Sequence, residues 1–103
     1  MAKSITVSVP HELPPNEVKR RLEHAIADAR TKHGELLKDT RETWPSDNQM
    51  DFTARAMGQT ITGSVRIELT HVHVTVTLPM LLAMFAAKLK PQIQAEGQKL
   101  FEK

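Results

Sequence analysis

His71 and His73 have the spacing that comes nearest to a site for chemistry in this chain. They stand in the stretch THVHVTVTLP, residues 70–79, among alternating valines. Residues two apart project from the same face of a β-strand, so the two imidazoles could hold a metal ion between them. The alternative is that they form the solvated side of an ordinary strand. A metal site needs three or four converging ligands, and only Glu68 offers a third, so we expect no bound metal.

The position of the nearest turn decides where each histidine points. Inward apolar residues have odd numbers before the turn and even numbers after it, and this change of parity places a hairpin turn near Leu69–Val72. We therefore expect His71 in or beside the turn. His73 is expected on the polar face of the following strand, across from Glu68 or Arg66.

No motif for catalysis or cofactor binding accompanies the histidines. The chain has no cysteine and contains no G-x-S-x-G, no H-E-x-x-H and no glycine-rich phosphate loop. The remaining histidines are scattered, with His11 in a loop, His24 on the outer face of a helix and His33 on its apolar stripe. A hydrolase would have only exposed serine and threonine hydroxyls as nucleophiles. We therefore expect no catalytic residue, no cofactor and no enzymatic activity.

The composition is typical of one globular domain spanning residues 1–103. Apolar residues make up 40% of the chain and charged residues 25%, which is ordinary for a soluble protein. The N-terminal segment shows no secretory signal. The longest apolar run, residues 78–87, is shorter than the roughly 20 residues of a membrane-spanning helix. Because no cysteine is present to form a disulfide, the expected location is the cytoplasm.

The net charge of +2 is concentrated at one end of the sequence. Residues 79–103 carry four lysines against two glutamates, whereas residues 1–78 carry ten basic and ten acidic side chains. No stripe of arginines with interleaved aromatic residues is present, so binding to a nucleic acid is not expected. The basic excess is therefore a property of the C-terminal segment.

Two periodicities define the N-terminal third of the chain. Residues 3–9 alternate apolar and polar side chains, as in a half-buried strand. From Pro15 onwards the apolar residues recur every three or four positions, which predicts an amphipathic helix of about 17–20 residues that ends near Gly34. Arg20 and Arg21 are expected on its polar face. The apolar stripe comprises Val18, Leu22, Ala25, Ile26, Ala29, His33 and Leu37.

Four further strands follow, joined by short turns. Turns this short do not allow crossovers, so the strands form an antiparallel meander with one apolar and one polar face. Gly63 falls at an inward position, where a glycine marks a bulge, a bend or a close approach by another element. The predicted strands are residues 40–44, 49–56, 60–69 and 72–78, and the first two turns are placed at residues 45–48 and at Gly58.

The last segment predicts a helix that lies over the sheet. Pro79 ends the final strand, and apolar residues repeat at helical spacing from Leu81 to Phe101. Pro91 interrupts this pattern while the apolar stripe continues, so we expect one kinked helix or two helices in line. The order β-α-β-β-β-β-α defines an α+β fold, in which two helices cover one face of a curved antiparallel sheet.

The start of this helix carries more apolar surface than one packed stripe requires. Part of it is therefore expected to remain for a partner protein, a second copy of the chain or a lipid-like surface. Trp44 either anchors the rim of the core or guards the mouth of a ligand cavity. The candidate ligand or partner surface comprises Trp44, Gly63, Met80, Leu81, Met84, Phe85 and Lys88.

A tryptophan, an aspartate-containing turn, two spaced glycines, a valine-rich strand and a Leu-Pro-led helix follow one another in order. The residues are Trp44, Asp47, Phe52, Gly58, Gly63, Val72, Val74, Val76, Leu81 and Leu82. In this order they resemble the polyhydroxyalkanoic acid system protein family, small bacterial proteins associated with polyester granules, over residues 4–101. The resemblance implies a role in polyhydroxyalkanoate metabolism or granule association, and it supplies no catalytic residue.

Two functions are compatible with these features. The first is a non-catalytic accessory protein that associates with a polyester granule, or with a granule protein, through its amphipathic C-terminal helix. The second is a small carrier that holds an acyl or hydroxyacyl group between that helix and the sheet. The element order looks like a shortened helix-grip architecture, whose larger members hold hydrophobic ligands in that place. Gly63 and the inward alanines would leave room for such a ligand.

Overall fold

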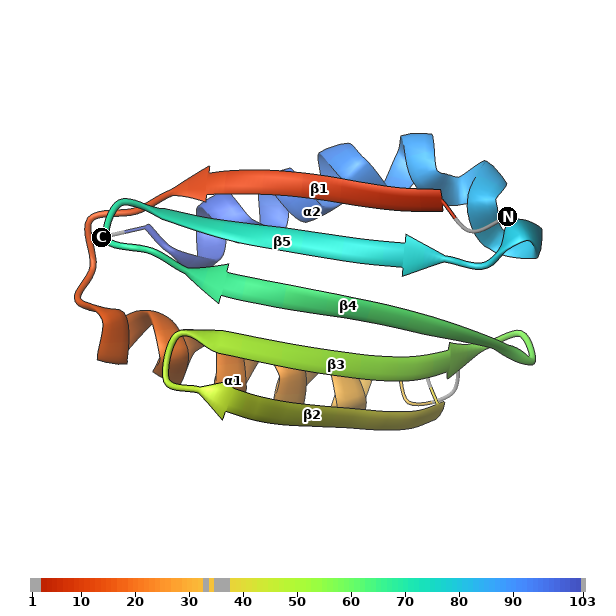
Figure 1. The fold of residues 1–103 in the computed structure, drawn as a ribbon, viewed down its shortest axis with the longest axis horizontal. Helices are drawn as coiled ribbons and strands as arrows, with labels where there is room; N and C mark the ends of the chain where they lie inside the picture. The colour runs from red at the N-terminus through yellow and green to blue at the C-terminus, as the bar shows by residue number, and fades with distance from the viewer. Residues whose placement is uncertain (1–2, 33, 35–37, 103) are drawn as a thin grey trace.

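The computed structural model describes residues 3–32, 34 and 38–102. Its elements are β1 (Lys3–Pro10), α1 (Pro15–Lys32), β2 (Lys38–Ser46), β3 (Gln49–Ala56), β4 (Gln59–Ile67), β5 (His71–Leu78), the 3₁₀ helix η1 (Met80–Phe85) and α2 (Ala86–Leu100). The strands form one antiparallel sheet in the order β1-β5-β4-β3-β2. Both helices lie behind this sheet, α2 behind β1 and β5 and α1 behind β2 and β3 (Figure 1). The predicted α+β class and element order are confirmed.

Strand pairing puts the apolar side chains of all the strands on one face. Val7 of β1 and Val65 of β4 both lie opposite Val74 of β5. Residues directly opposite each other in an antiparallel pair share a face. The odd-numbered residues of β1 and β4 and the even-numbered residues of β3 and β5 therefore point toward the helices. The other face carries rows of serine, threonine, arginine and histidine side chains, as predicted.

The turns on either side of β3 are both tight. Met57 and Gly58 join β3 to β4, and both have a positive φ (55° and 75°), as a two-residue hairpin turn requires. The turn before β3 lies at Asp47–Asn48 and not at residues 45–48, because β2 continues through Pro45 to its end. A proline is tolerated there because β2 is an edge strand, where one side of the backbone has no ladder to complete.

The β4–β5 turn comes earlier than the apolar pattern suggests. β4 ends at Ile67, which lies opposite Val72, and the Glu68 N–H donates a hydrogen bond to the His71 carbonyl (2.8 Å). The apolar pattern predicts that Leu69 points inward like the other odd-numbered apolar residues before the turn, and this prediction is wrong. It lies in the turn with its side chain 82% exposed, because the chain has already left the sheet at this point.

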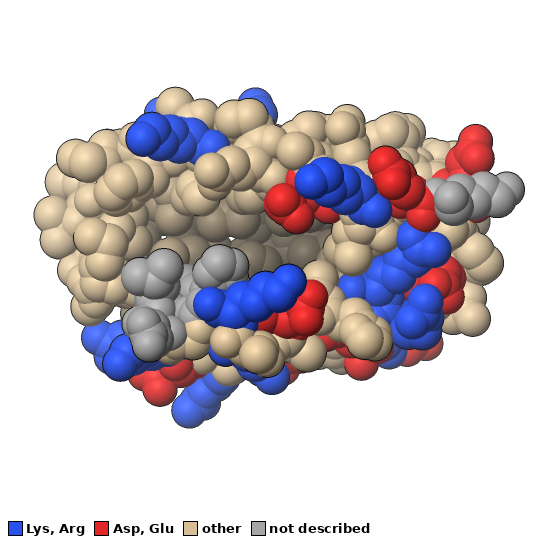
Figure 2. Space-filling model, turned by 180° about the vertical axis from the view of Figure 1, so that it is seen from behind, with Lys and Arg blue, Asp and Glu red and all other residues tan. Residues whose placement is uncertain are grey.

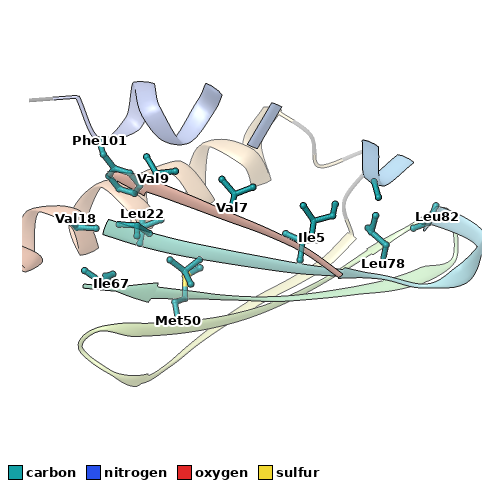
Figure 3. Close-up of a cluster of buried hydrophobic side chains, with 14 residues drawn as sticks. Ile5, Val7, Val9, Val18, Leu22, Met50, Ile67, Leu78, Leu82 and Phe101 are labelled. Carbon is teal, nitrogen blue, oxygen red and sulfur yellow. The ribbon is translucent and has the colours of Figure 1, made fainter. Parts of the chain in front are cut away.

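The core fills the space between the sheet and the helices (Figure 3). At one end, Val18 and Leu22 from α1 meet Phe101, which follows α2, above Val9 of β1. At the other end, η1 folds back over the last residue of β5 and contributes Leu82. Each large side chain buried in this way contributes roughly 1.5–3 kcal/mol to folding. The core therefore runs along the whole sheet and fixes both helices to it.

α1 presents its predicted apolar stripe to the sheet. Val18 is fully buried and Leu22 nearly so. The helix begins at Pro15, where a missing N–H leaves no hydrogen bond unmade. The predicted places of His33 and Leu37 on this stripe lie outside the described residues.

Arg21 connects α1 to the end of α2. Its Nη1 donates hydrogen bonds to the carbonyl oxygens of Leu100 (2.9 Å) and Glu102 (2.5 Å). Carbonyls at the C-terminus of a helix lack partners within the helix, and a cation there also meets the negative end of the helix dipole. Arg21, which is predicted on the polar face of α1, therefore caps the end of α2 with its guanidinium group.

The C-terminal segment consists of two helices, but they divide at Phe85–Ala86 and not at Pro91, where the sequence predicts the interruption. η1 is a 3₁₀ helix, and α2 follows it directly and continues through Pro91, which lies on its exposed side. α2 approaches β1 closely at Gly97, where an added Cβ would lie 2.8 Å from Val9 Cγ2. The glycine therefore allows the helix backbone to rest on the first strand.

Candidate functional site

The two histidines lie side by side on the polar face of the sheet. β5 begins at His71, which pairs with Pro10 at the end of β1, so His71 is the first strand residue and lies beside the turn, as predicted. The rings of His71 and His73 are nearly parallel, with centroids 6.2 Å apart and 9° between their planes. His71 Nδ1 forms a hydrogen bond with the Thr70 hydroxyl (2.8 Å). The predicted position of His73 on the polar face is confirmed.

His73 is held between a hydroxyl and a carboxylate. Its Nδ1 lies 2.6 Å from Ser8 Oγ, and its Nε2 lies 3.0 Å from Glu68 Oε1. The pairing with Glu68 follows from the predicted hairpin. Ser8 is a residue that the sequence does not single out. Alternation places it on the polar face, but its meeting with His73 depends on the pairing of β1 with β5.

A shallow depression of about 240 Å³ lies beside His73 on this face. Arg66 pairs with His73 across the β4–β5 ladder and contributes a guanidinium group to the wall. In residues 3–32, 34 and 38–102, no three His, Cys, Asp or Glu side chains come together as metal ligands. The depression can therefore hold a small polar ligand by hydroxyl, amide and guanidinium groups. It is lined by Gln49, Ser64, Arg66, Glu68, His73 and Thr75.

His11 is buried and supports the turn that carries Glu68. Its side chain is only 6% exposed, and its Nε2 donates a hydrogen bond to the Glu68 carbonyl (2.8 Å). The Leu13 N–H donates to His11 Nδ1 (3.2 Å), which fixes the proton on Nε2. The His11 N–H in turn donates to the Thr70 carbonyl (2.9 Å). The sequence places His11 in a loop correctly but gives no sign that this loop is anchored.

Four large apolar side chains of η1 face solvent, and only Leu82 of this helix is buried. Their exposed fractions are 66% for Met80, 69% for Leu81, 79% for Met84 and 38% for Phe85, and these four residues are called the η1 patch below. Leu81 and Phe85 do not join the packed stripe, because a 3₁₀ helix turns its side chains through three residues per turn and not 3.6. Lys88 lies exposed in the first turn of α2.

A hollow runs between α1 and α2 on the helix side of the sheet, and uncharged side chains form its floor (Figure 2). Phe52, Ile61 and Val74 belong to the inner face of the three central strands but are only half-buried. Gly63 does not enlarge this hollow, contrary to the expectation that it leaves room for a ligand. An added Cβ there would lie 2.2 Å from the Phe52 ring, so the ring already occupies the space.

Trp44 is half-buried on β2, at the opposite edge of the sheet from β1. Its Nε1 donates a hydrogen bond to Glu42 Oε2 (3.2 Å), and Lys19 Nζ lies 4.8 Å from its ring centroid. Glu42 also lies 3.9 Å from an Arg30 guanidinium nitrogen. Trp44 is therefore part of a partly polar rim. The structure gathers the η1 patch and Lys88 but leaves Trp44 and Gly63 in separate places.

Comparison with known proteins gives one match in sequence and several in structure. Residues 5–101 match the family model described as "Putative polyhydroxyalkanoic acid system protein". No curated protein gives a significant sequence match.

Two solved structures have the same overall fold. Ara h 8.0201 gives a TM-score of 0.55 at 10% identity over 98% of this chain and 95% of that chain. The di-domain ARO/CYC BexL from the BE-7585A biosynthetic pathway gives 0.54 at 11% identity over 99% of this chain and 50% of that chain. Both are helix-grip folds, so the predicted helix-grip-like architecture is confirmed. Among the described helices, none is long and apolar enough to cross a membrane.

Proposed function

This chain belongs to the family of putative polyhydroxyalkanoic acid system proteins, and from that membership we propose that it is an accessory protein of polyhydroxyalkanoate metabolism. It binds the surface of a polyester granule in the cytoplasm, or a protein on that surface, through the η1 patch. The exposure of this patch is the observation that carries the proposal. The role needs a surface and no reaction.

The η1 patch suits an apolar surface better than water. Transfer of one fully exposed side chain of this size out of water contributes roughly 1.5–3 kcal/mol. Two of the four residues are methionines, whose flexible side chains adapt to an irregular surface. Lys88 and Lys90 follow in the first two turns of α2 and are exposed. Their ammonium groups can stay in water while the aliphatic stems lie along the granule.

Co-sedimentation with poly(3-hydroxybutyrate) particles tests this role. The double variant Leu81→Gln/Met84→Gln removes the two most exposed members of the patch without touching the buried Leu82. We expect its affinity to fall about 100-fold, since two lost contacts amount to roughly 3 kcal/mol. Leu69→Gln is the matched control, because Leu69 is 82% exposed in the β4–β5 turn, outside η1.

Two results would count against the role. If the double variant sediments with the particles as fully as Leu69→Gln, the η1 patch is not the binding surface. If the wild-type protein sediments neither with the particles nor with native granules that retain their surface proteins, the proposed association itself is wrong.

The hollow between α1 and α2 favours a second candidate function, a carrier of a hydrophobic acyl or hydroxyacyl ligand. Phe52, Ile61 and Val74 on the helix-facing side of the three central strands are only half-buried, and a ligand over them would complete their burial. The gain from covering this surface is the driving force for binding.

Titration with 3-hydroxydecanoate tests the carrier function, with 3-hydroxybutyrate as the short-chain control. Trp44 is the only tryptophan, so its emission reports a ligand on the inner side of the sheet. At 100 times the Kd the ligand should add about 2.7 kcal/mol of stability and raise the Tm by several degrees. An unchanged Tm with millimolar 3-hydroxydecanoate would rule the carrier out. Retained binding in Leu81→Gln/Met84→Gln would separate this function from granule binding.

A further inference from the structure

Ser8, His73 and Glu68 come from three separate segments and meet on the outer face of the sheet. We propose that they form an ester-hydrolysing site, with Ser8 as the nucleophile, His73 as the general base and Glu68 as the carboxylate that orients His73. The site takes small esters whose acyl part ends in a carboxylate. It lies near the start of β5, whereas η1 follows the end of β5 (Figure 1), so it is separate from the granule-binding surface.

The hydrogen bonds place the protons where the reaction needs them. An ionised Glu68 carboxylate can only accept, so the proton of neutral His73 lies on Nε2, which is 3.0 Å from Glu68 Oε1. His73 Nδ1 then carries a lone pair and accepts the hydroxyl proton of Ser8, 2.6 Å away. A nucleophile bonded to a base that a third group orients is the arrangement of serine hydrolases, here with the two ring nitrogens exchanged.

The backbones of the three residues are held in place by the fold. Ser8 and His73 are directly opposite each other in the β1–β5 ladder. The backbone of Glu68 is fixed by two hydrogen bonds, because its N–H donates to the His71 carbonyl (2.8 Å) and its carbonyl accepts from His11 Nε2 (2.8 Å). Paired strands and an anchored turn therefore fix the backbone positions of the three residues before a substrate binds.

A backbone N–H is available for the oxyanion. The Ser8 carbonyl points away from β5, because it accepts a hydrogen bond from Gln94 Nε2 of α2 (3.1 Å). The N–H and carbonyl of one residue in an antiparallel strand point to the same side. The Ser8 N–H therefore projects from the edge of β1 that pairs with no strand, on the side where Gln94 of α2 binds the Ser8 carbonyl, and it can donate to the oxygen of a tetrahedral intermediate.

Arg66 sets the class of substrate. Ser8, His73 and Arg66 lie in one row across β1, β5 and β4, and two strand spacings separate the ends of the row by about 10 Å. The Arg66 side chain lines the depression beside His73 and can bind a carboxylate with two parallel hydrogen bonds. An ester carbonyl at Ser8 with the carboxylate of its acyl part a few bonds away, toward Arg66, fits this row, as in half-esters of short dicarboxylic acids.

The reaction needs only the ester and water, and every atom and proton in it is accounted for. Ser8 Oγ attacks the ester carbonyl carbon, and its proton moves to His73 Nδ1. The tetrahedral intermediate collapses, the C–O bond to the alcohol breaks, and the alcohol takes the proton from His73. Water then attacks the acyl-Ser8 ester with His73 again as base, which releases the carboxylic acid and restores the Ser8 hydroxyl.

Two chromogenic esters test the proposal on the full-length protein. Mono-p-nitrophenyl glutarate carries the carboxylate, and p-nitrophenyl butyrate lacks it. We expect Ser8→Ala and His73→Ala to lower the hydrolysis rate of both esters by about 100-fold or to the buffer rate. Ser4→Ala is the matched control, because Ser4 lies on the same face of β1 but bonds to Thr77 (3.1 Å), and it should keep the full rate.

Two further readouts separate nucleophilic catalysis by Ser8 from attack by an exposed imidazole. A fluorophosphonate should label the peptide that contains Ser8 in the wild-type protein, and should fail to label it in His73→Ala. Arg66→Gln should raise KM for the glutarate ester about tenfold, the loss of roughly 1.4 kcal/mol of binding, and leave KM for the butyrate ester unchanged.

The proposal fails if Ser8→Ala hydrolyses the esters as fast as the wild-type protein, or if no label reaches Ser8. Circular dichroism must show the same Tm for both proteins in this comparison. The Leu81→Gln/Met84→Gln variant should keep its esterase rate, so failure of granule binding and failure of hydrolysis are separate results.

Discussion

Gly63 lies on the inner face of the sheet at a position with no room for a side chain. An added Cβ would lie 2.2 Å from the Phe52 ring and 2.8 Å from the Thr75 carbonyl oxygen. Overpacking of this kind forces side chains from their rotamers and shifts the backbone. We therefore expect Gly63→Ala to lower the free energy of unfolding by about 1–3 kcal/mol, as measured by urea denaturation.

A double variant identifies the cause of that loss. Phe52→Leu removes the ring that the new methyl group would strike, so Gly63→Ala should cost less in the Phe52→Leu background than in the wild-type protein. The rescue should be partial, because the Thr75 carbonyl stays in place. Equal losses in both backgrounds would show that the Phe52 ring is not the obstacle.

Single residues are predictable from the sequence only where a local pattern decides them. Alternation places Gly63 on the inner face and His73 on the outer face, and both placements agree with the structure. Ser8 meets His73 across 65 positions of the sequence, and His11 meets Glu68 across 57. The residues next to Ser8 and His11 in the sequence do not indicate which strand or turn will lie beside them in the fold. The candidate chemistry on the outer face therefore becomes visible only with the pairing of β1 and β5.

At the scale of elements, one arginine joins the two helices. Arg21 binds Glu17 within α1 (3.0 Å) and two carbonyls at the end of α2, whereas Arg20 binds only Glu17 in the described residues. We expect Arg21→Gln to lower the free energy of unfolding by about 1–2 kcal/mol, the value of hydrogen bonds to a charged group at a half-exposed site. Arg20→Gln is the control and should change it much less. Equal Tm values for the two variants would contradict the cap.

The first turn of α1 should make stability depend on pH. Hydrogen bonds from Arg20 and Arg21 lower the pKa of Glu17 from 4.5 to about 2. A carboxyl whose pKa is lower in the folded state stabilises the fold above pH 4.5, and this contribution disappears as the pH falls toward 2. The difference in Tm between the wild-type protein and Glu17→Gln should therefore shrink between pH 5 and pH 2.5. A difference that stays constant over this range would refute the linkage.

The sequence predicts whether an element is a helix or a strand better than it predicts where the element begins and ends. Regular alternation identifies β1, β3 and β5 because one side of each strand is buried. β2 is longer than predicted, since an edge strand with mostly exposed side chains carries little apolar signal. η1 and α2 read as one helical stripe, because repeats of three and of 3.6 residues look alike over six positions. That difference is what leaves Leu81 and Phe85 outside the core.

At the scale of the whole molecule, the helices leave part of the sheet uncovered. α1 and α2 meet where Arg21 caps α2 and separate along the sheet, which gives the hollow of Figure 2. The sequence shows which residues face inward but not whether they fill the space or line it. Phe52 both fills space and lines it. Its ring closes the space over Gly63, and its side chain stays half-exposed. The placement of the two helices therefore decides how much of the inner face of the sheet stays open to a ligand.

The η1 patch should also make the protein self-associate when no granule is present. Large apolar side chains that cluster on a surface favour contact with a second copy, because this contact removes them from water. Small-angle scattering at low concentration should give a radius of gyration near the 13.2 Å of one chain, which is also the value of about 13 Å typical of a compact domain of this length. We expect the radius to rise with wild-type protein concentration and to stay constant for Leu81→Gln/Met84→Gln. A rise of the same size in both proteins would assign self-association to another surface, such as the free edge of β1 or of β2.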